Sequence, residues 1–346
     1  MNQEFPRFLK LSVADRVDVF EAEAERLDTL ASYVEKDFWV CWILDVLYNG
    51  LPKDRPRILF KGGTSLSKVY GLIERFSEDV DLTIFAEDLG FPRALDTDPA
   101  TMSKKQRERL SKDIISKTGA YISQQLREDL EQIITKLVSN CAIVVDPECK
   151  DSSTLLFLYP SLFDRDDNDY VRSIVKLEGG GRSAVDPHQE YPIEPLIANT
   201  LTDWDFSVPN LITIDAQRTF WDKVFILHGL SCGYRDENRL PNDRQRLSRH
   251  YYDVAKIYDS EIGKLAVINH DLRERVRQRK LSFFNAAWKK FDEAIPGSFC
   301  VAPTGELLEV LRKDYQAMQG MMLGRATEFQ QIIAILSELE TVINNS

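Results

Sequence analysis

The sequence predicts an α/β (α+β) protein in which a mixed α/β half, up to about residue 210, is followed by a mainly helical half. Two observations predict this division. In the first half, short apolar segments alternate with longer segments of helical periodicity, which is typical of a sheet flanked by helices. After Ile214, apolar residues recur at helical spacing almost to the C-terminus.

The first elements are bounded by stop signals. We expect a helix over residues 14–48, which Asn49-Gly50-Leu51-Pro52 ends. Residues 57–60 are a short apolar strand candidate, and Gly62-Gly63 interrupts it. A helix is then expected over residues 64–73, because the hydroxyl residues at its start suit a helix N-terminus.

The rest of the α/β half repeats this alternation. Apolar and polar residues alternate over 79–84, which predicts a strand with one apolar and one polar face. A long helix is expected over 102–138, and further strands are expected at 141–146, 154–159 and 171–178. A stretch with Gly and Pro from Gly179 to Pro209 follows, so we place two domains at 1–210 and 211–346.

Composition and charge limit the function classes. The 346 residues are 43% hydrophobic and 29% charged, a globular composition that excludes a disordered chain. The formal net charge of −11 argues against non-specific nucleic-acid binding, so an RNA partner would need a local basic surface, such as residues 104–112 or 273–280.

Targeting and redox signals are weak or missing. The longest apolar run, Phe38 to Leu44, is too short to cross a bilayer, and the N-terminus has no secretory pattern. Five cysteines, an odd number without a Cys-x-x-Cys pair, argue against a disulfide framework or a zinc ribbon. We therefore expect a cytoplasmic protein with no membrane partner.

The most informative segment is Phe60-Lys61-Gly62-Gly63-Thr64-Ser65. Two glycines after a strand allow a tight turn and close approach of the backbone to a ligand. The helix N-terminus that follows supplies unpaired N–H groups that suit phosphate oxygens, and the hydroxyls of Thr64 and Ser65 can add hydrogen bonds. Alone, the segment also fits an ordinary capped helix start.

Asp79 and Asp81 strengthen the functional interpretation. Residues two apart on a strand point to the same face, while Val80 and Leu82 occupy the other face. Two adjacent carboxylates repel each other unless a cation lies between them, and Mg²⁺ prefers one or two carboxylates together with substrate phosphates. The alternative is a solvated acidic strand face. Glu78 has the opposite parity and is expected to be peripheral.

These segments resemble the AbiEii/AbiGii-type nucleotidyltransferase toxins, which belong to the DNA polymerase β-like nucleotidyltransferase superfamily. The resemblance rests on an ordered set of motifs from residue 34 to residue 253: Val34 to Val40, Gly62 to Ser65, Arg75 to Leu82, Val175 to Ser183, Arg218 to Lys223 and Arg249 to Asp253. It implies a mixed sheet with flanking helices, and a helical C-terminal region that contributes to the same cleft.

The resemblance also implies site residues. Lys61 to Ser65 would bind the nucleotide, and Asp79, Asp81 and Glu178 would hold Mg²⁺, or Mn²⁺ in its place. Glu178 would be a third catalytic acid, or otherwise an exposed glutamate at a strand end. Arg182 and Lys223 would contact nucleotide phosphates, unless they are ordinary surface cations. Asp253 would be a catalytic residue, although Arg249 at i−4 also allows a simple intrahelical ion pair.

The resemblance implies a toxin of a toxin–antitoxin or phage-defence system, with a separately encoded antitoxin as partner. It would transfer a nucleoside monophosphate from an NTP, ATP among them, to the 3′ end of tRNA or another RNA. Two alternatives remain open at this stage. The acceptor could be a protein hydroxyl or a small molecule, or the chain could be a catalytically silent nucleotide- or RNA-binding module.

Overall fold

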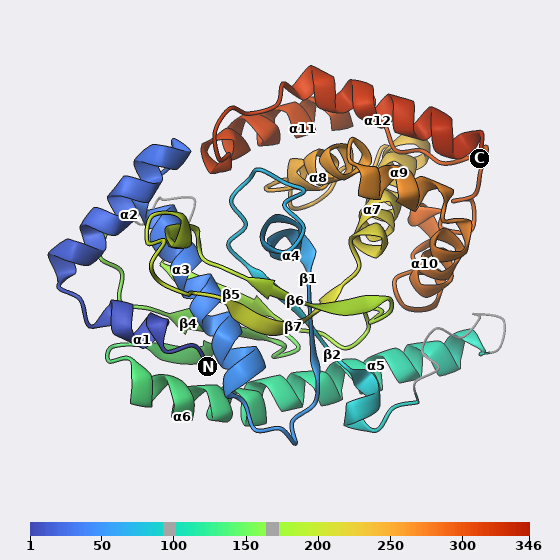
Figure 1. Ribbon diagram of the computed structural model, residues 1–346. Helices are drawn as coiled ribbons and strands as arrows, with labels where there is room; N and C mark the ends of the chain where they lie inside the picture. The colour runs from blue at the N-terminus through green and yellow to red at the C-terminus, as the bar shows by residue number, and fades with distance from the viewer. Residues whose placement is uncertain (93–101, 164–172) are drawn as a thin grey trace. The chain divides into compact units, whose positions relative to one another are not determined.

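The computed structural model describes residues 1–92, 102–163 and 173–346 (Figure 1). The described chain divides into two compact units. The first, built from residues 1–71, 76–92, 112–163 and 173–214, contains the sheet. The second contains residues 72–75, 102–111 and 215–346 and is mainly helical. Along the chain the division falls at Ile214, near the boundary of about 210 placed from the sequence.

One mixed sheet of seven strands forms the centre of the first unit, in the order β3-β4-β5-β2-β1-β7-β6. The pairs β1/β7 and β2/β5 are parallel, and the others are antiparallel. The α/β fold class expected from the sequence is confirmed. The strands are β1 (Ile58–Lys61), β2 (Val80–Ile84), β3 (Ala142–Val145), β4 (Thr154–Leu158), β5 (Ile174–Glu178), β6 (His188–Ile193) and β7 (Val208–Ile214).

The sheet has one thoroughly covered face. Its alternate residues, such as Phe60, Leu82, Phe157 and Leu177, join a large buried apolar cluster. The helices of this unit are α1 (Glu4–Leu9), α2 (Val13–Leu27), α3 (Ala31–Asp45), η1 (Val46–Gly50), α4 (Gly62–Lys68), η2 (Ala86–Leu89), α5 (Lys104–Tyr121), η4 (Ile122–Leu126), α6 (Arg127–Leu137) and η5 (Leu196–Asn199). The first turns of α5 group with the second unit.

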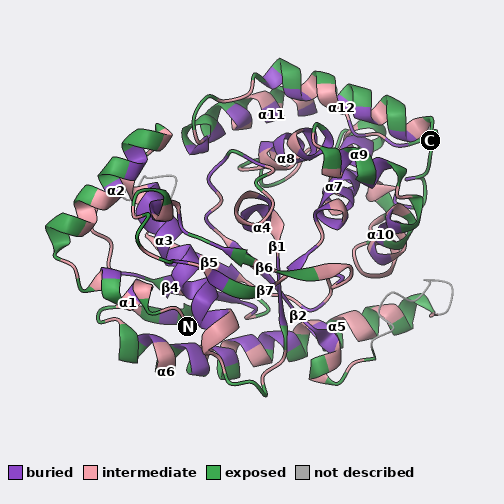
Figure 2. Cartoon of the chain, viewed as in Figure 1, coloured by how far each residue is buried: buried purple, intermediate pink, exposed green. Residues whose placement is uncertain are grey.

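Helix α3 is the central element of that covered face. Its residues are buried from Tyr33 to Asp45, as Figure 2 shows by its purple colour over most of its length. A helix that is buried on nearly all sides lies inside the fold. The rings of Trp39 and Trp42 lie 5.9 and 5.5 Å from the ring of Phe157 on β4, so α3 packs directly on the sheet.

The second unit packs helices around α7. Trp221 on α7 contacts Phe225 and Phe299 and donates a hydrogen bond from its indole nitrogen to the carbonyl of Ala266. Asp215 caps the N-terminus of α7 by accepting the N–H of Gln217. The helices are α7 (Ala216–Glu237), α8 (Ser248–Tyr258), α9 (Glu261–Ile268), α10 (His270–Phe283), η6 (Ala287–Lys289), α11 (Gly305–Met318), η7 (Gln319–Met321) and α12 (Phe329–Asn344).

Three expectations about elements are corrected. The helix expected over 14–48 is two helices, because Asp28 ends α2 in a left-handed conformation with φ of 50°. The helix expected over 64–73 ends at Lys68. The stretch 179–209, expected as a separator, contains β6 and the start of β7. Pro192 in β6 weakened its strand signal, and β6 is an edge strand, where proline is tolerated.

The other elements lie where the sequence predicts them, within a few residues. The strand expected at 171–178 is β5, although residues 171 and 172 lie outside the described residues. The helix expected over 102–138 is continuous through α5, η4 and α6. Within the described residues, none of the helices combines the length and the apolar character that crossing a membrane requires.

The two faces of β4 give a test of this packing. Phe157→Ala should cost about 3–5 kcal/mol of unfolding free energy, because it leaves a cavity against Trp39 and Trp42. Leu158→Ala, on the exposed face of the same strand, should cost roughly 1 kcal/mol or less. Urea unfolding followed by tryptophan fluorescence measures both, and equal costs would contradict the assignment of faces.

Candidate active site

The glycine turn and the carboxylate strand are in direct contact. Lys61, the last residue of β1, pairs with Asp81 on β2. Gly62 follows with φ of +80°, a conformation that residues with a side chain rarely adopt. A Cβ at this position would lie 1.9 Å from Oδ2 of Asp81, so only glycine allows the carboxylate to lie over the turn.

The hydroxyls of the turn serve the protein itself. Thr64 is buried, and its Oγ1 donates to the carbonyl of Asp79 and contacts Oγ of Ser77 at 3.0 Å. Ser65 is also buried, and its Oγ donates to the carbonyl of Gly62 at 2.9 Å. The expectation that these two hydroxyls bind phosphate is therefore corrected. Phosphate contacts from Thr64 and Ser65 would fall to their backbone N–H groups.

Asp79, Asp81 and Glu178 share one face of the sheet. Asp81 and Glu178 are direct neighbours in the parallel pair β2/β5. Asp79 lies two residues before Asp81 and is also half-buried, whereas Val80 between them is fully buried. The alternation predicted from the sequence thus places the three carboxylates on the face opposite the large apolar cluster.

Lys176 lies among these carboxylates. Its Nζ is 2.8 Å from Glu178 and 3.6 Å from Asp146. Burial lowers the pKa of Lys176, but Glu178, Asp146 and Asp79 outweigh burial and raise it above its ordinary value. Lys176 is therefore a firmly charged cation that offsets part of the acidic cluster. No role in the site was expected for Lys176 from the sequence.

The expected metal site of three carboxylates is not assembled. Across residues 1–92, 102–163 and 173–346, no three or more Asp, Glu, His or Cys side chains are arranged to hold a metal ion. Glu178 faces Lys176 instead. The two aspartates still suit Mg²⁺ or Mn²⁺, because Mg²⁺ is commonly bound by one or two carboxylates with nucleotide phosphates completing its shell. Arg182 is half-buried in the loop after Gly179-Gly180-Gly181, and its role stays a prediction.

Helix α3 holds both halves of this arrangement through buried charges. Lys36 forms an ion pair with Glu78, 2.7 Å long, next to Asp79 in the sequence. Asp37 pairs with Lys68, the last residue of α4, and accepts the N–H of Leu196 at 2.7 Å. Burial opposes the charge on Lys68, but Asp37 outweighs it and raises the pKa of Lys68.

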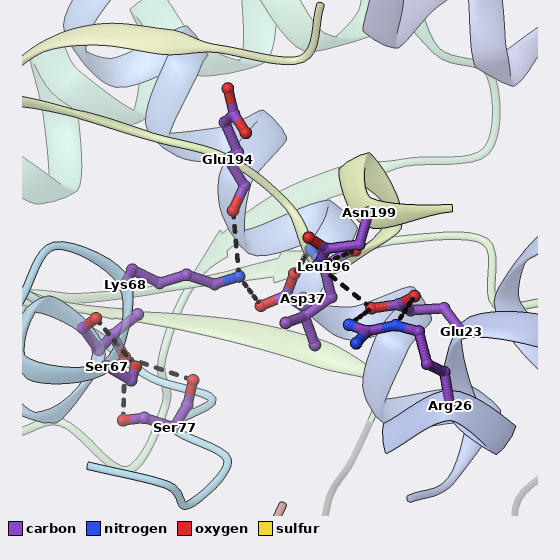
Figure 3. Close-up of polar contacts among 10 residues, drawn as sticks. Glu23, Arg26, Asp37, Ser67, Lys68, Ser77, Glu194, Leu196 and Asn199 are labelled. Carbon is purple, nitrogen blue, oxygen red and sulfur yellow. Dashed lines mark hydrogen bonds and ion pairs between the residues drawn. The ribbon is translucent and has the colours of Figure 1, made fainter. Parts of the chain in front are cut away.

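Figure 3 shows how these contacts continue along the chain. Lys68 lies between Asp37 and the carbonyl of Glu194, to which it donates at 3.2 Å. Glu23 on α2 binds Arg26 and the amide of Asn199. Glu78, which was expected to be peripheral to the site, is buried and forms its ion pair with Lys36 on α3. Glu78 directly precedes Asp79, so its side chain was expected to point to the other face. The sequence alone did not indicate that Lys36 would lie on that face.

The helical unit contains its own buried charge cluster. Asp253 on α8 is fully buried and accepts two hydrogen bonds from Arg75, each 2.8 Å long. Its Oδ2 also lies 2.9 Å from Nζ of Lys223 on α7. Nζ of Lys223 lies 3.4 Å from Nδ1 of His250. The structure thus brings Lys223 and Asp253 together within this unit.

Burial and neighbouring charges shift the pKa values of Asp253, Lys223 and His250. Burial raises the pKa of Asp253, but Arg75 and Lys223 outweigh burial and hold it below its ordinary value. Burial, with Arg75 and Arg249, lowers the pKa of Lys223 despite its contact with Asp253. Burial and the charge of Lys223 also hold the pKa of His250 well below its usual value. The imidazole is therefore neutral at pH 7, so its Nδ1 can accept a hydrogen bond.

Arg75 is the residue that sequence reasoning missed. It was noted only as the first residue of a motif, and Asp253 was matched with Arg249 as the alternative to a catalytic role. The structure gives Asp253 the partners Arg75 and Lys223 instead. In the sequence, Arg75 lies four residues before Asp79. In the structure, residues 72–75 belong to the helical unit, where the backbone N–H of Glu74 also donates to the hydroxyl of Tyr252.

Comparison with known proteins identifies the family of this chain. The family described as "Nucleotidyl transferase AbiEii toxin, Type IV TA system" matches residues 45–335. The chain belongs to the AbiEii nucleotidyltransferase toxin family. The family expected from the sequence is thereby confirmed, and membership implies an enzyme with a nucleotide substrate and an antitoxin partner. The buried charges of α3 lie before the matched region.

A solved structure of similar fold is MenT4, a nucleotidyltransferase toxin from Mycobacterium tuberculosis H37Rv. It is 15% identical in sequence to this AbiEii-family chain, with a TM-score of 0.44 over 96% of this chain and 98% of that one. No curated protein sequence matches the chain.

A double-mutant cycle tests the buried pair on α3. Lys36→Met should cost about 3–5 kcal/mol of unfolding free energy, because it leaves Glu78 charged and buried. Lys36→Met/Glu78→Leu should cost less than the sum of the costs of Lys36→Met and Glu78→Leu, since both members of the ion pair are then removed together. Arg127→Met, which removes a more exposed pair with Glu131, should cost less than about 1 kcal/mol. Additive costs for Lys36 and Glu78 in urea unfolding would rule out the coupling.

The Asp253 cluster gives a pH-dependent prediction. Its carboxyl has a lower pKa in the folded than in the unfolded protein, so its ionisation stabilises the fold above about pH 4 and less as pH falls below that. Asp253→Asn should therefore cost about 3–5 kcal/mol at pH 7 and less at pH 3. Arg249→Ala is the matched control and should change stability little. A large loss of stability with Arg249→Ala would instead support an intrahelical ion pair between Arg249 and Asp253.

Proposed function

We propose that this chain is a metal-dependent nucleotidyltransferase that moves a nucleoside monophosphate from an NTP to the 3′ hydroxyl of an RNA, tRNA being the leading acceptor. The observation that carries the proposal is the contact between Gly62 and Asp81, which places a turn suited to phosphate directly beside a pair of aspartates. This is the neighbourhood that metal-assisted transfer to or from a triphosphate requires.

The proposed reaction forms one bond to phosphorus and breaks another, and the acceptor hydroxyl gives up its proton. The oxygen of the acceptor hydroxyl attacks the α-phosphorus of the NTP, and the bond from that phosphorus to the oxygen bridging to the β-phosphate breaks. Pyrophosphate leaves with the electron pair. A bound Mg²⁺ or Mn²⁺ would neutralise charge that develops on the phosphate oxygens.

We assign a role to each of the site residues. Asp79 and Asp81 would hold the cation together with the nucleotide phosphates, and Lys61 and the backbone at Gly62 and Gly63 would face the triphosphate. We assign Glu178, beside Asp81, to accept the proton of the attacking hydroxyl.

Cations of the chain would support binding of the nucleotide. Lys223 keeps an N–H donor beyond those directed at Asp253 and His250, which leaves it able to bind phosphate. Arg182 is proposed as a second phosphate contact.

One basic stretch offers less to RNA than its sequence suggests. On α10, Arg277 pairs with Glu274, Lys280 pairs with Asp222, and Arg279 is buried. Phosphates of the acceptor would therefore find fewer available cations there than the five basic residues at 273–280 imply.

Labelled NTPs, Mg²⁺ and total tRNA, incubated with the purified chain, test the proposal. Wild type should transfer label, a chelator should abolish transfer, and added Mg²⁺ should restore it. Asp79→Asn and Asp81→Asn should each reduce transfer by about 10³-fold, because both carboxylates act as one unit. Asp18→Asn, an exposed carboxylate on α2, is the control and should keep full activity.

Two outcomes would contradict it. Transfer that survives both aspartate substitutions would exclude the assigned metal site. Transfer that persists at full level in a cell extract from which nuclease has removed RNA would identify a protein or small-molecule acceptor.

A further inference from the structure

Two cysteines distant in the sequence meet inside the helical unit. Cys232 lies on α7, and Cys300 lies in the segment between η6 and α11. The Sγ of Cys232 lies 3.6 Å from Nε2 of His228, and the backbone N–H of Cys300 donates to Nδ1 of the same ring at 3.1 Å. The thiol of Cys232 also donates a hydrogen bond to the sulfur of Cys300. We call these two cysteines, which are both free thiols, the thiol pair.

The backbone around Cys300 is held in place from two sides. The ring of the preceding residue, Phe299, packs against two aromatic rings of α7. The backbone of Phe299 also exchanges two hydrogen bonds with the side chain of Asn344 on α12. Glu340, on the same helix, accepts the two backbone N–H groups that follow Cys300. These contacts keep Cys300 against α7 and therefore beside Cys232.

The imidazole of His228 positions the thiol pair. Its Nε2 lies 3.0 Å from the backbone carbonyl of Lys290, and its Nδ1 accepts the N–H of Cys300. A carbonyl can only accept, so these two contacts assign the proton of the neutral ring to Nε2. Burial lowers the pKa of His228, which favours this neutral form. Both ring nitrogens are thus used by the backbone, and His228 orients the cysteines without taking a proton from them.

The two thiols have unlike environments. Cys232 is fully buried, and its hydrogen bond to Cys300, together with burial, raises its pKa. Cys300 is half-buried, and the same hydrogen bond, with help from the charge of Arg235, lowers its pKa despite burial and the charge of Glu340. An accessible thiol of low pKa beside a second cysteine is the arrangement found at cysteines that react with peroxides.

We propose that the thiol pair is an oxidation site, at which a peroxide converts Cys232 and Cys300 into an intramolecular disulfide. Cys300 is the thiol that a peroxide can reach, and Cys232 is the neighbour that completes the bond. The disulfide ties α7, which carries Lys223, to the segment before α11. This inference does not depend on the proposed function, because neither cysteine has a role in nucleotidyl transfer.

The proposed oxidation takes place in two balanced steps. With hydrogen peroxide, the thiolate of Cys300 attacks one oxygen, the O–O bond breaks, and hydroxide leaves with the electron pair and takes up a proton. Cys300 is then a sulfenic acid. The sulfur of Cys232 attacks the sulfur of Cys300, the S–O bond breaks, and the proton of Cys232 leaves with the hydroxyl as water. Two thiols are oxidised, and one peroxide is reduced to two waters.

Mass spectrometry of the full chain, treated with hydrogen peroxide, tests the proposal without any variant. The chain is denatured, alkylated and digested without reduction. Peptides containing Cys232 and Cys300 should be joined, with the loss of about 2 Da that one disulfide causes, and dithiothreitol should separate them. Cys300 should lose its thiol about tenfold faster than Cys149, whose thiol donates to Asp151. Equal rates, or a bond from Cys300 to a different cysteine, would overturn the proposal.

Serine variants separate the two steps. In Cys232→Ser, the sulfenic acid of Cys300 should persist and react with dimedone, whereas wild type should lose this reactivity as the disulfide forms. Cys149→Ser is the matched control and should form the same disulfide as wild type. Dimedone labelling of Cys300 that is equal in wild type and Cys232→Ser would show that Cys232 does not complete the bond, and would overturn the proposal.

Thermal unfolding shows whether the fold accepts the bond. Peroxide should raise the melting temperature of wild type by roughly 5 °C or more, because the disulfide restricts the unfolded chain, and dithiothreitol should reverse the rise. Cys300→Ser, treated in the same way, controls for oxidation elsewhere and should show no rise. A wild-type chain that melts no higher after oxidation than Cys300→Ser would show that the bond distorts the fold, and would overturn the proposal.

Discussion

Buried charge on α3 is the constraint on which the rest of the first unit depends. Glu35, Lys36 and Asp37 are consecutive and buried, and an unpaired buried charge costs several kcal/mol. Each finds its partner on a different segment, because consecutive helical residues point in different directions. Glu35 accepts the N–H of Leu162, Lys36 pairs with Glu78, and Asp37 pairs with Lys68. The helix cannot bury these charges unless the glycine-turn helix and the carboxylate strand lie in their observed places.

The two faces of the sheet differ in character: one is buried and apolar, and the other carries the acidic residues. One face carries Phe60, Leu82 and Phe157 against α3 and provides most of the buried apolar surface of this unit. The opposite face carries the aspartates, and it remains polar or exposed near them. Acidic residues can stay close together there because solvent and the cation of Lys176 reduce their repulsion. Because successive side chains of a strand point to opposite faces, the five residues of β2 place apolar and acidic side chains on different faces of the sheet.

In the helical unit, one carboxylate supports two cations. Asp253 pairs with both Arg75 and Lys223. Burial, together with the charges of Arg75 and Arg249, lowers the pKa of Lys223, and the carboxylate of Asp253 opposes this shift. Asp253 therefore supports the charge of Lys223 from inside the helical unit. Stability and activity should be measured together for any substitution at Asp253.

The sequence by itself determined the local features: the glycine turn, the parity of Asp79 and Asp81, most helices and strands, and the family. These follow from backbone conformation and side-chain period, which act over a few residues. Only the tertiary structure decided which charges pair, such as Arg75 with Asp253 and Lys176 with Glu178. It also decided that the Thr64 hydroxyl serves the fold, and that the polar segment 188–193 is a strand. Partner choice depends on burial and on residues distant in the chain, and a local pattern contains no information about either.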